Sequence, residues 1–89
     1  MKPFERDQYY DDLVRSVGAG ELTLGQAVRK LRIDVAEMNQ ATFAKMTKVS
    51  ERTLRNLEND TGNPTVATTR AVLKPFGLNL VIGRRSHHD

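Results

Sequence analysis

The sequence of 89 residues contains no cysteine and no tryptophan, and only 6% of its residues are aromatic. Without cysteine, neither a disulfide nor a thiolate zinc site can stabilise the fold. No apolar run approaches the roughly 18 residues that cross a bilayer, so we expect no membrane partner. The opening MKPFERDQYYDD lacks the apolar core of a secretory signal. These absences predict a cytoplasmic protein.

Charge is present in both signs but is unevenly distributed. The formal net charge is +3, from 14 basic and 11 acidic residues. Residues 1–22 carry three basic and five acidic side chains, whereas residues 23–62 carry seven and five, and residues 63–89 carry four and one. An acidic start followed by a basic remainder suggests that the two parts face different partners, and the basic part permits a polyanion.

Apolar periodicity and capping residues predict an all-α chain, a compact bundle of four to five helices. The Gly18-Ala-Gly20 step ends the first helix, and Thr23 with Gln26 forms a capping box for the second. Asn39, Ser50 and Thr65 are suited to N-cap three further helices. We expect the helices at residues 5–17, from 24 to about 35, at 40–46, at 51–59 and from 66 to about 73.

One short stretch of β-forming residues follows the helices. Residues 78–82 read LNLVI, which predicts a strand, and the chain contains no second strand to pair with it. An unpaired strand edge is a liability, and its simplest partner is the same strand of a second copy. We therefore predict a homodimer whose dimerisation residues are Leu78, Leu80, Val81 and Ile82. The predicted organisation is an acidic helical extension (1–22), a central helical domain (23–77), a dimerisation strand (78–83) and a flexible tail (84–89).

Residues 40–59 carry the pattern of two short helices that meet through a tight turn. Small Ala44 allows the helices to approach closely, and Leu54 and Leu57 face inward, which is the helix-turn-helix pattern. In such a motif the second helix enters the major groove. Its outer residues have the chemistry to read bases: Arg52 and Arg55 for guanine, Asn56 for adenine, and Glu51 for cytosine. Gln40, at a helix N-terminus, can bind phosphate.

Three basic residues of the second helix lie off its apolar stripe. Arg29, Lys30 and Arg32 are expected to form either a solvated basic face or an edge that faces phosphates.

The segment NQATFAKMTKVSERTLRNLEND, residues 39–60, resembles the helix-turn-helix of the Cro/phage-repressor (XRE) class. The resemblance implies that Gln40, Thr53 and Asn59 contact phosphates. It also implies that Ser50, Glu51, Arg52 and Asn56 read the bases of double-stranded DNA. Two positions depart from the family pattern, because Lys48 stands where glycine is usual and Thr47 where an aliphatic residue is usual.

The ending LKPFGLNLVIGR, residues 73–84, resembles that of HipB-type antitoxins. This resemblance implies paired C-terminal strands, a palindromic operator and a HipA-like kinase toxin as partner. The implied function is a repressor that autoregulates its operon and neutralises the toxin. Two alternatives remain, an ordinary XRE-family regulator without a toxin partner and a protein-binding module that retains the fold.

Enzymatic and metal sites are not predicted. His87, His88 and Asp89 occupy a terminal tail without a third preorganised ligand. Gly18 and Gly20 follow no strand and lack the third glycine of a dinucleotide-binding loop. No acid–base pair is recognisable, so we expect a non-enzyme without catalytic residues, metal or cofactor.

Overall fold

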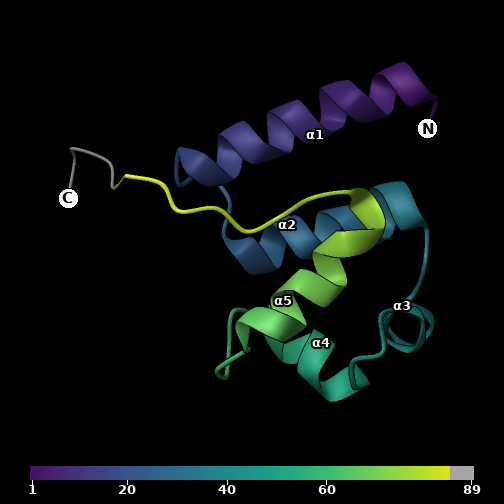
Figure 1. Cartoon of the computed structure of the whole chain (residues 1–89). Helices are drawn as coiled ribbons and strands as arrows, with labels where there is room; N and C mark the ends of the chain where they lie inside the picture. The colour runs from purple at the N-terminus through teal and green to yellow at the C-terminus, as the bar shows by residue number, and fades with distance from the viewer. Residues whose placement is uncertain (85–89) are drawn as a thin grey trace.

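The computed structural model describes residues 1–84, and this part of the chain is built almost entirely from helices (Figure 1). Two of the five α-helices continue directly into a helical segment of another type, α2 into the π-helix η1 and α5 into the 3₁₀-helix η2. The elements in chain order are α1 (Pro3–Gly18), α2 (Leu24–Lys30), η1 (Leu31–Ala36), α3 (Gln40–Thr47), α4 (Glu51–Glu58), α5 (Val66–Leu73) and η2 (Lys74–Phe76). The all-α prediction is confirmed.

The helix starts follow from local capping chemistry, as predicted. The Thr23 side chain accepts a hydrogen bond from the backbone N–H of Gln26, and Gln26 bonds back to complete the capping box. Asn39, Ser50 and Thr65 each accept one from the backbone N–H three residues later, at 2.8–3.0 Å. These bonds satisfy donors that a helix N-terminus otherwise leaves unpaired.

The core forms where α2, η1, α3, α4 and α5 meet. Its largest fully buried side chains are Phe43, Leu31, Leu54, Val28 and Val72. Helix α2 approaches the end of α4 very closely at Gly25. A Cβ atom there would collide with the Leu57 carbonyl oxygen and with the Asp60 carboxylate, which accepts a 2.9 Å hydrogen bond from the Gly25 N–H. Only glycine permits this approach.

Helix α1 lies along the side of the body that is turned away from α3 and α4 (Figure 1). It is held by buried Leu13 and by a 2.6 Å hydrogen bond that the Tyr9 hydroxyl donates to Asp34 of η1. Burial, together with the adjacent Asp34 carboxylate, raises the pKa of the Tyr9 hydroxyl well above its usual value. The hydroxyl therefore stays protonated and keeps donating across the ordinary pH range.

The strand predicted at residues 78–83 is not formed within residues 1–84 of the single chain. Residues 78–84, the C-terminal arm, leave η2 at Gly77 (φ 69°). Among the described residues they make one backbone hydrogen bond, which the Leu78 N–H donates to the Leu73 carbonyl. The prediction required a second strand, which one chain does not supply. Figure 1 shows the arm running beside α1 and α2 and then projecting beyond them.

Two predicted helix boundaries differ slightly from the structure, and the predicted tail lies almost entirely outside the described residues. Helix α1 spans Pro3–Gly18 rather than residues 5–17, and the second helix ends as the π-helix η1. The predicted flexible tail falls, except for exposed Arg84, outside the described residues. In the described chain, every helix is too short or too polar to traverse a lipid bilayer.

Candidate nucleic-acid interface

Helices α3 and α4 are joined by a tight turn at residues 48–50. Lys48 takes the left-handed conformation (φ 62°, ψ 34°), which glycine adopts more readily. Thr47, which replaces an aliphatic residue, is buried, and its hydroxyl donates to the Phe43 carbonyl at 2.8 Å. The Val49 N–H donates to the Ala44 carbonyl at 3.0 Å and closes the turn. Both departures from the family pattern are thus accommodated within a well-bonded turn.

The outer surface of α4 carries the predicted base-reading residues. Leu54 and Leu57 are buried, whereas Glu51, Arg52 and Arg55 are exposed. Arg52 makes no ion pair with any described residue, and Arg55 makes a 4.0 Å contact with half-exposed Glu51. An exposed pair of this kind contributes little stability. Both guanidinium groups can therefore be recruited by another acceptor at low cost.

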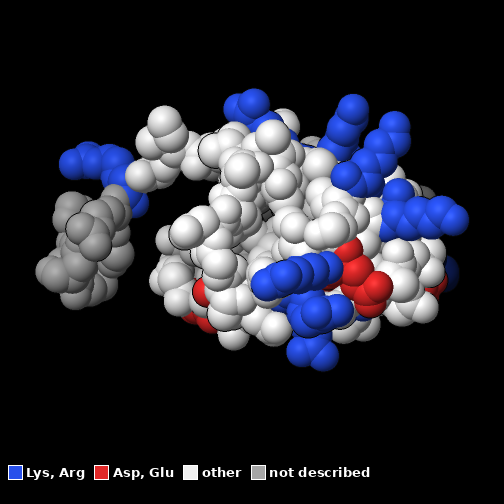
Figure 2. Space-filling view, turned by 90° about the horizontal axis from the view of Figure 1, so that it is seen from below, with Lys and Arg blue, Asp and Glu red and all other residues white. Residues whose placement is uncertain are grey.

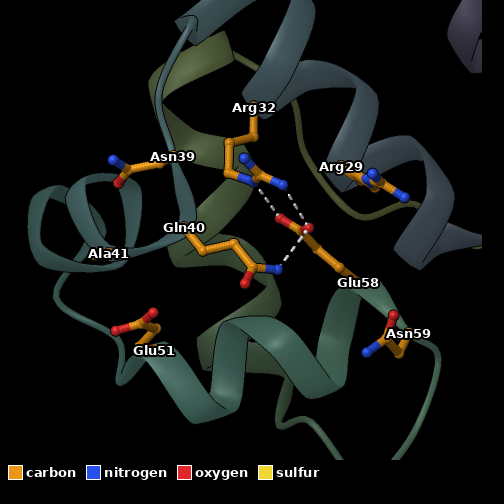
Figure 3. Close-up of a pocket in the computed structure, with 8 residues that line it drawn as sticks. All are labelled: Arg29, Arg32, Asn39, Gln40, Ala41, Glu51, Glu58 and Asn59. Carbon is orange, nitrogen blue, oxygen red and sulfur yellow. Dashed lines mark hydrogen bonds and ion pairs between the residues drawn. The ribbon is translucent and has the colours of Figure 1, made fainter.

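A buried polar network joins α4 to α3 and η1. Both carboxylate oxygens of Glu58 accept from the guanidinium of Arg32, at 2.7 Å from Nε and 3.0 Å from Nη2. Gln40 Nε2 donates to the same carboxylate at 3.1 Å. Arg32 also donates to the Met38 carbonyl at 2.8 Å. Figure 3 shows the Arg32, Gln40 and Glu58 side chains pointing toward one another from three different elements.

This network corrects the prediction for Arg32. We expected Arg32 on a solvated or phosphate-facing surface with Arg29 and Lys30, but its side chain is only 9% exposed and is paired with Glu58. Arg29 and Lys30 are exposed as expected. The signal for the pair was present in the sequence, because Glu58 lies four residues after Leu54 and shares its inward face. A buried carboxylate requires a cationic partner.

The network forms the floor of an open, polar hollow of about 470 Å³. Its lining residues are Arg29, Arg32, Asn39, Gln40, Ala41, Glu51, Glu58 and Asn59. The hollow therefore brings together two of the three predicted phosphate-binding residues, Gln40 and Asn59, with one predicted base reader, Glu51. One Nε2 hydrogen of Gln40 serves Glu58 and the second remains available, as do the first backbone N–H groups of α3.

Thr53 and Asn56 lie on the opposite flank of α4. They line a small hollow of about 100 Å³ with the loop at residues 61–64. The Ser50 hydroxyl donates to Thr53 Oγ1 at 2.7 Å, so the Thr53 hydroxyl hydrogen remains available to an acceptor. Ser50 itself is occupied as the α4 N-cap. The predicted phosphate contacts thus fall on both sides of the α4 surface. The loop at residues 61–64 beside them was not predicted from the sequence as part of the site.

Basic side chains are prominent on this side of the molecule. Figure 2 looks at the chain from below its position in Figure 1, and Lys and Arg cover more of this face than Asp and Glu do. Arg29 of α2, Lys45 of α3, and Arg52 and Arg55 of α4 are exposed cations of the elements that form the interface. A surface with this excess of positive charge attracts a polyanion. No group of three or more potential metal-ligating side chains is found in residues 1–84.

The helix-turn-helix is also recognised by comparison with known protein families. A helix-turn-helix family model matches residues 28–82, which is more than half of the chain. The chain belongs to the XRE-like helix-turn-helix family. Neither the curated proteins nor the solved structures gave a significant match. As a member of this family, the XRE-like protein is a DNA-binding transcriptional regulator. The family match does not include α1, because it begins at residue 28.

Proposed function

We propose that this XRE-like protein is a homodimeric repressor that binds a palindromic operator with two copies of α4. The observation that carries the proposal is the exposed α4 surface with Arg52 and Arg55 at its centre and hydrogen-bond donors on both flanks. Arg52, Arg55, Asn56, Glu51 and Ser50 read bases, and Gln40, Thr53 and Asn59 bind phosphates. This division matches the general rule that phosphate contacts position a protein whereas base contacts specify the sequence.

The dimensions of the chain suit a two-fold complex. The described chain measures 38 × 34 × 18 Å along its principal axes. Half-sites in successive major grooves are about 34 Å apart. Two copies side by side can therefore present one α4 to each groove, with dimer contacts through the C-terminal arms.

Replacement of Arg52 by alanine tests base reading. Loss of a bidentate contact to guanine is expected to weaken operator binding by about 1–3 kcal/mol and to relax the preference at one base pair of each half-site. The operator is first obtained by selection from random duplexes with the purified protein. Fluorescence anisotropy then measures the affinity of wild-type and variant proteins for that operator and for single-base substitutions.

Gln40→Ala is the matched control for Arg52→Ala. It removes an uncharged phosphate donor, so binding should weaken by a similar factor for all duplexes. The slope of affinity against salt should stay the same, because no positive charge is lost. If Arg52→Ala left both affinity and base preference unchanged, α4 would not read the operator through this residue. A wild-type signal that is absent or insensitive to salt would favour the protein-binding alternative.

We further propose that the repressor is the antitoxin of a HipA/HipB-like operon. Support comes from the acidic residues of α1, a helix outside the family match. Glu5, Asp7 and Asp11 are exposed and belong to the helix that lies away from α4 (Figure 1). A basic surface of a partner protein could dock there while α4 remains on DNA. Under the antitoxin hypothesis this partner is a HipA-like kinase.

Co-expression with a HipA-type kinase, taken from the gene neighbourhood of this chain where one is encoded there, tests the antitoxin proposal. Wild-type protein should relieve growth arrest by the kinase and co-purify with it. The charge-reversed Glu5→Lys/Asp7→Lys/Asp11→Lys variant should lose at least tenfold in kinase affinity and retain its operator affinity. Failure of the wild-type protein to bind the kinase, or a gene neighbourhood without such a kinase, would leave an ordinary XRE-family regulator.

A further inference from the structure

An apolar groove of about 300 Å³ lies between α1, α2 and the C-terminal arm. Leu13, Val14 and Val17 of α1 form one wall, and residues 78–81 and Gly83 of the arm form another. None of its lining residues carries a charge. Such a lining offers no charged group to bind a phosphate, unlike the α4 surface. It favours an apolar ligand. The groove is therefore distinct from the DNA interface.

The most exposed apolar side chains of the arm lie directly beside this groove. Val81 is 86% exposed and Ile82 is fully exposed, while Val14 on the facing helix is 56% exposed. Monomeric proteins rarely leave a contiguous apolar patch of this kind in water. Figure 1 shows the end of the arm projecting beyond α1 and α2. Val81 and Ile82 belong to this last part of the described chain, so they can reach beyond their own chain.

We propose that the groove of each chain receives Val81 and Ile82 of a second copy, so that α1 is part of the dimer interface. This inference rests on the homodimer of the proposed function and adds to it a partner for the arm, namely the groove wall formed by Val14. The proposed interface is an exchange of the ends of the two arms. Residues 78–80 stay in place as a wall of their own groove, and Val81 and Ile82 cross the two-fold axis into the groove of the other chain.

Self-complementarity favours a second copy over any other occupant. A two-fold interface uses the same patch on both chains, so the patch must contain both a cavity and the groups that fill it. The groove supplies the cavity. Val81, which lines the groove, and its neighbour Ile82 supply exposed, uncharged side chains of matching chemistry. The patch lies at α1, away from α3 and α4, so its burial leaves the DNA surface accessible.

The absence of native cysteine permits a direct test by disulfide cross-linking between two single-cysteine proteins. Val14→Cys protein carrying a size tag is mixed with untagged Ile82→Cys protein and oxidised mildly. A mixed disulfide requires the two sulfur atoms to approach across the interface. We expect the mixed product to exceed by at least about fivefold that of a control in which tagged Phe4→Cys replaces Val14→Cys; Phe4 is exposed and does not line the groove. Equal yields in the two mixtures would overturn the proposal.

Sedimentation of charged variants provides the second measurement. Val14→Asp and Ile82→Asp should each raise the dimer dissociation constant about tenfold or more, because the carboxylate would be buried without a partner. Val66→Asp is the control, since exposed Val66 lies at the start of α5 and outside the groove. Dimers that withstand Val14→Asp overturn the role of α1. Cross-linked dimers that fail to bind any operator would contradict the proposed function and leave this inference intact.

Discussion

Glu58→Ala is expected to lower the free energy of unfolding by about 3–5 kcal/mol, since removal of one member of a buried ion pair leaves the other charge without compensation. The Arg32 side chain is 9% exposed, and its Nε and Nη2 would lose acceptors that now lie at 2.7 and 3.0 Å. Folded domains have only about 5–15 kcal/mol of stability in total. Urea titration followed by circular dichroism, at one fixed protein concentration, measures the change.

The double variant Arg32→Met/Glu58→Leu separates stability from function. Apolar replacement of a whole buried pair is often neutral or stabilising, so this variant should unfold near the wild-type midpoint. Gln40, however, would lose the acceptor that now holds its Nε2 at 3.1 Å. Operator affinity should therefore fall although the protein is folded. A double variant as unstable as Glu58→Ala would contradict the charge argument, and one with full operator affinity would show that the network does not position Gln40.

Capping chemistry explains why so much of the fold could be predicted. Thr23, Asn39, Ser50 and Thr65 act within three residues of their own position, so their effect is local and visible in a single sequence. The apolar stripes of α2 and α4 are likewise visible in a single sequence, because they depend only on the spacing of nearby residues. The turn between α3 and α4 was also predictable, and Lys48, at the position where glycine is usual, adopts the left-handed conformation there.

The buried network was harder to predict because it depends on tertiary contacts. Arg32 and Glu58 are 26 positions apart, and the π-helical winding of η1 changes the direction in which its side chains point. An ideal helix wheel places Arg32 at the edge of the apolar stripe, about 40° from Val28, so periodicity alone did not decide between an exposed and a buried position. Local periodicity predicted the inward face of α4 correctly but did not identify what the carboxylate on that face would bind.

The C-terminal arm illustrates a different limit. Its β-forming residues predicted a strand, yet strand geometry depends on a partner that supplies a hydrogen-bond ladder. The described single chain offers none, and the arm instead extends beside α1 with Val81 and Ile82 exposed. The sequence thus indicated a β-forming segment without a pairing partner. It did not indicate the groove beside this segment, because the groove is formed by α1, α2 and the arm together.

Phe43→Ala is expected to lower the free energy of unfolding by about 3–5 kcal/mol, the usual cost of removing a large aromatic side chain from a core. The Phe43 side chain is fully buried, and its ring stacks on Phe76 with centroids 5.9 Å apart and planes 25° apart. Phe43 belongs to α3 and Phe76 to η2, so this contact ties the helix-turn-helix to the base of the arm. Urea titration of the variant measures the loss.

The same chain provides a matched control, because Phe4 is 71% exposed on α1 and Phe4→Ala should change the stability by less than about 0.5 kcal/mol. A double-mutant cycle with Phe76→Ala then isolates the stacking contact, which is expected to contribute about 0.5–1.5 kcal/mol beyond area burial. Equal losses for Phe43→Ala and Phe4→Ala would contradict the buried position of Phe43. Zero coupling between Phe43 and Phe76 would mean that α3 does not hold η2 through these rings, and the arm would then depend on Leu73 and Leu78 for its position.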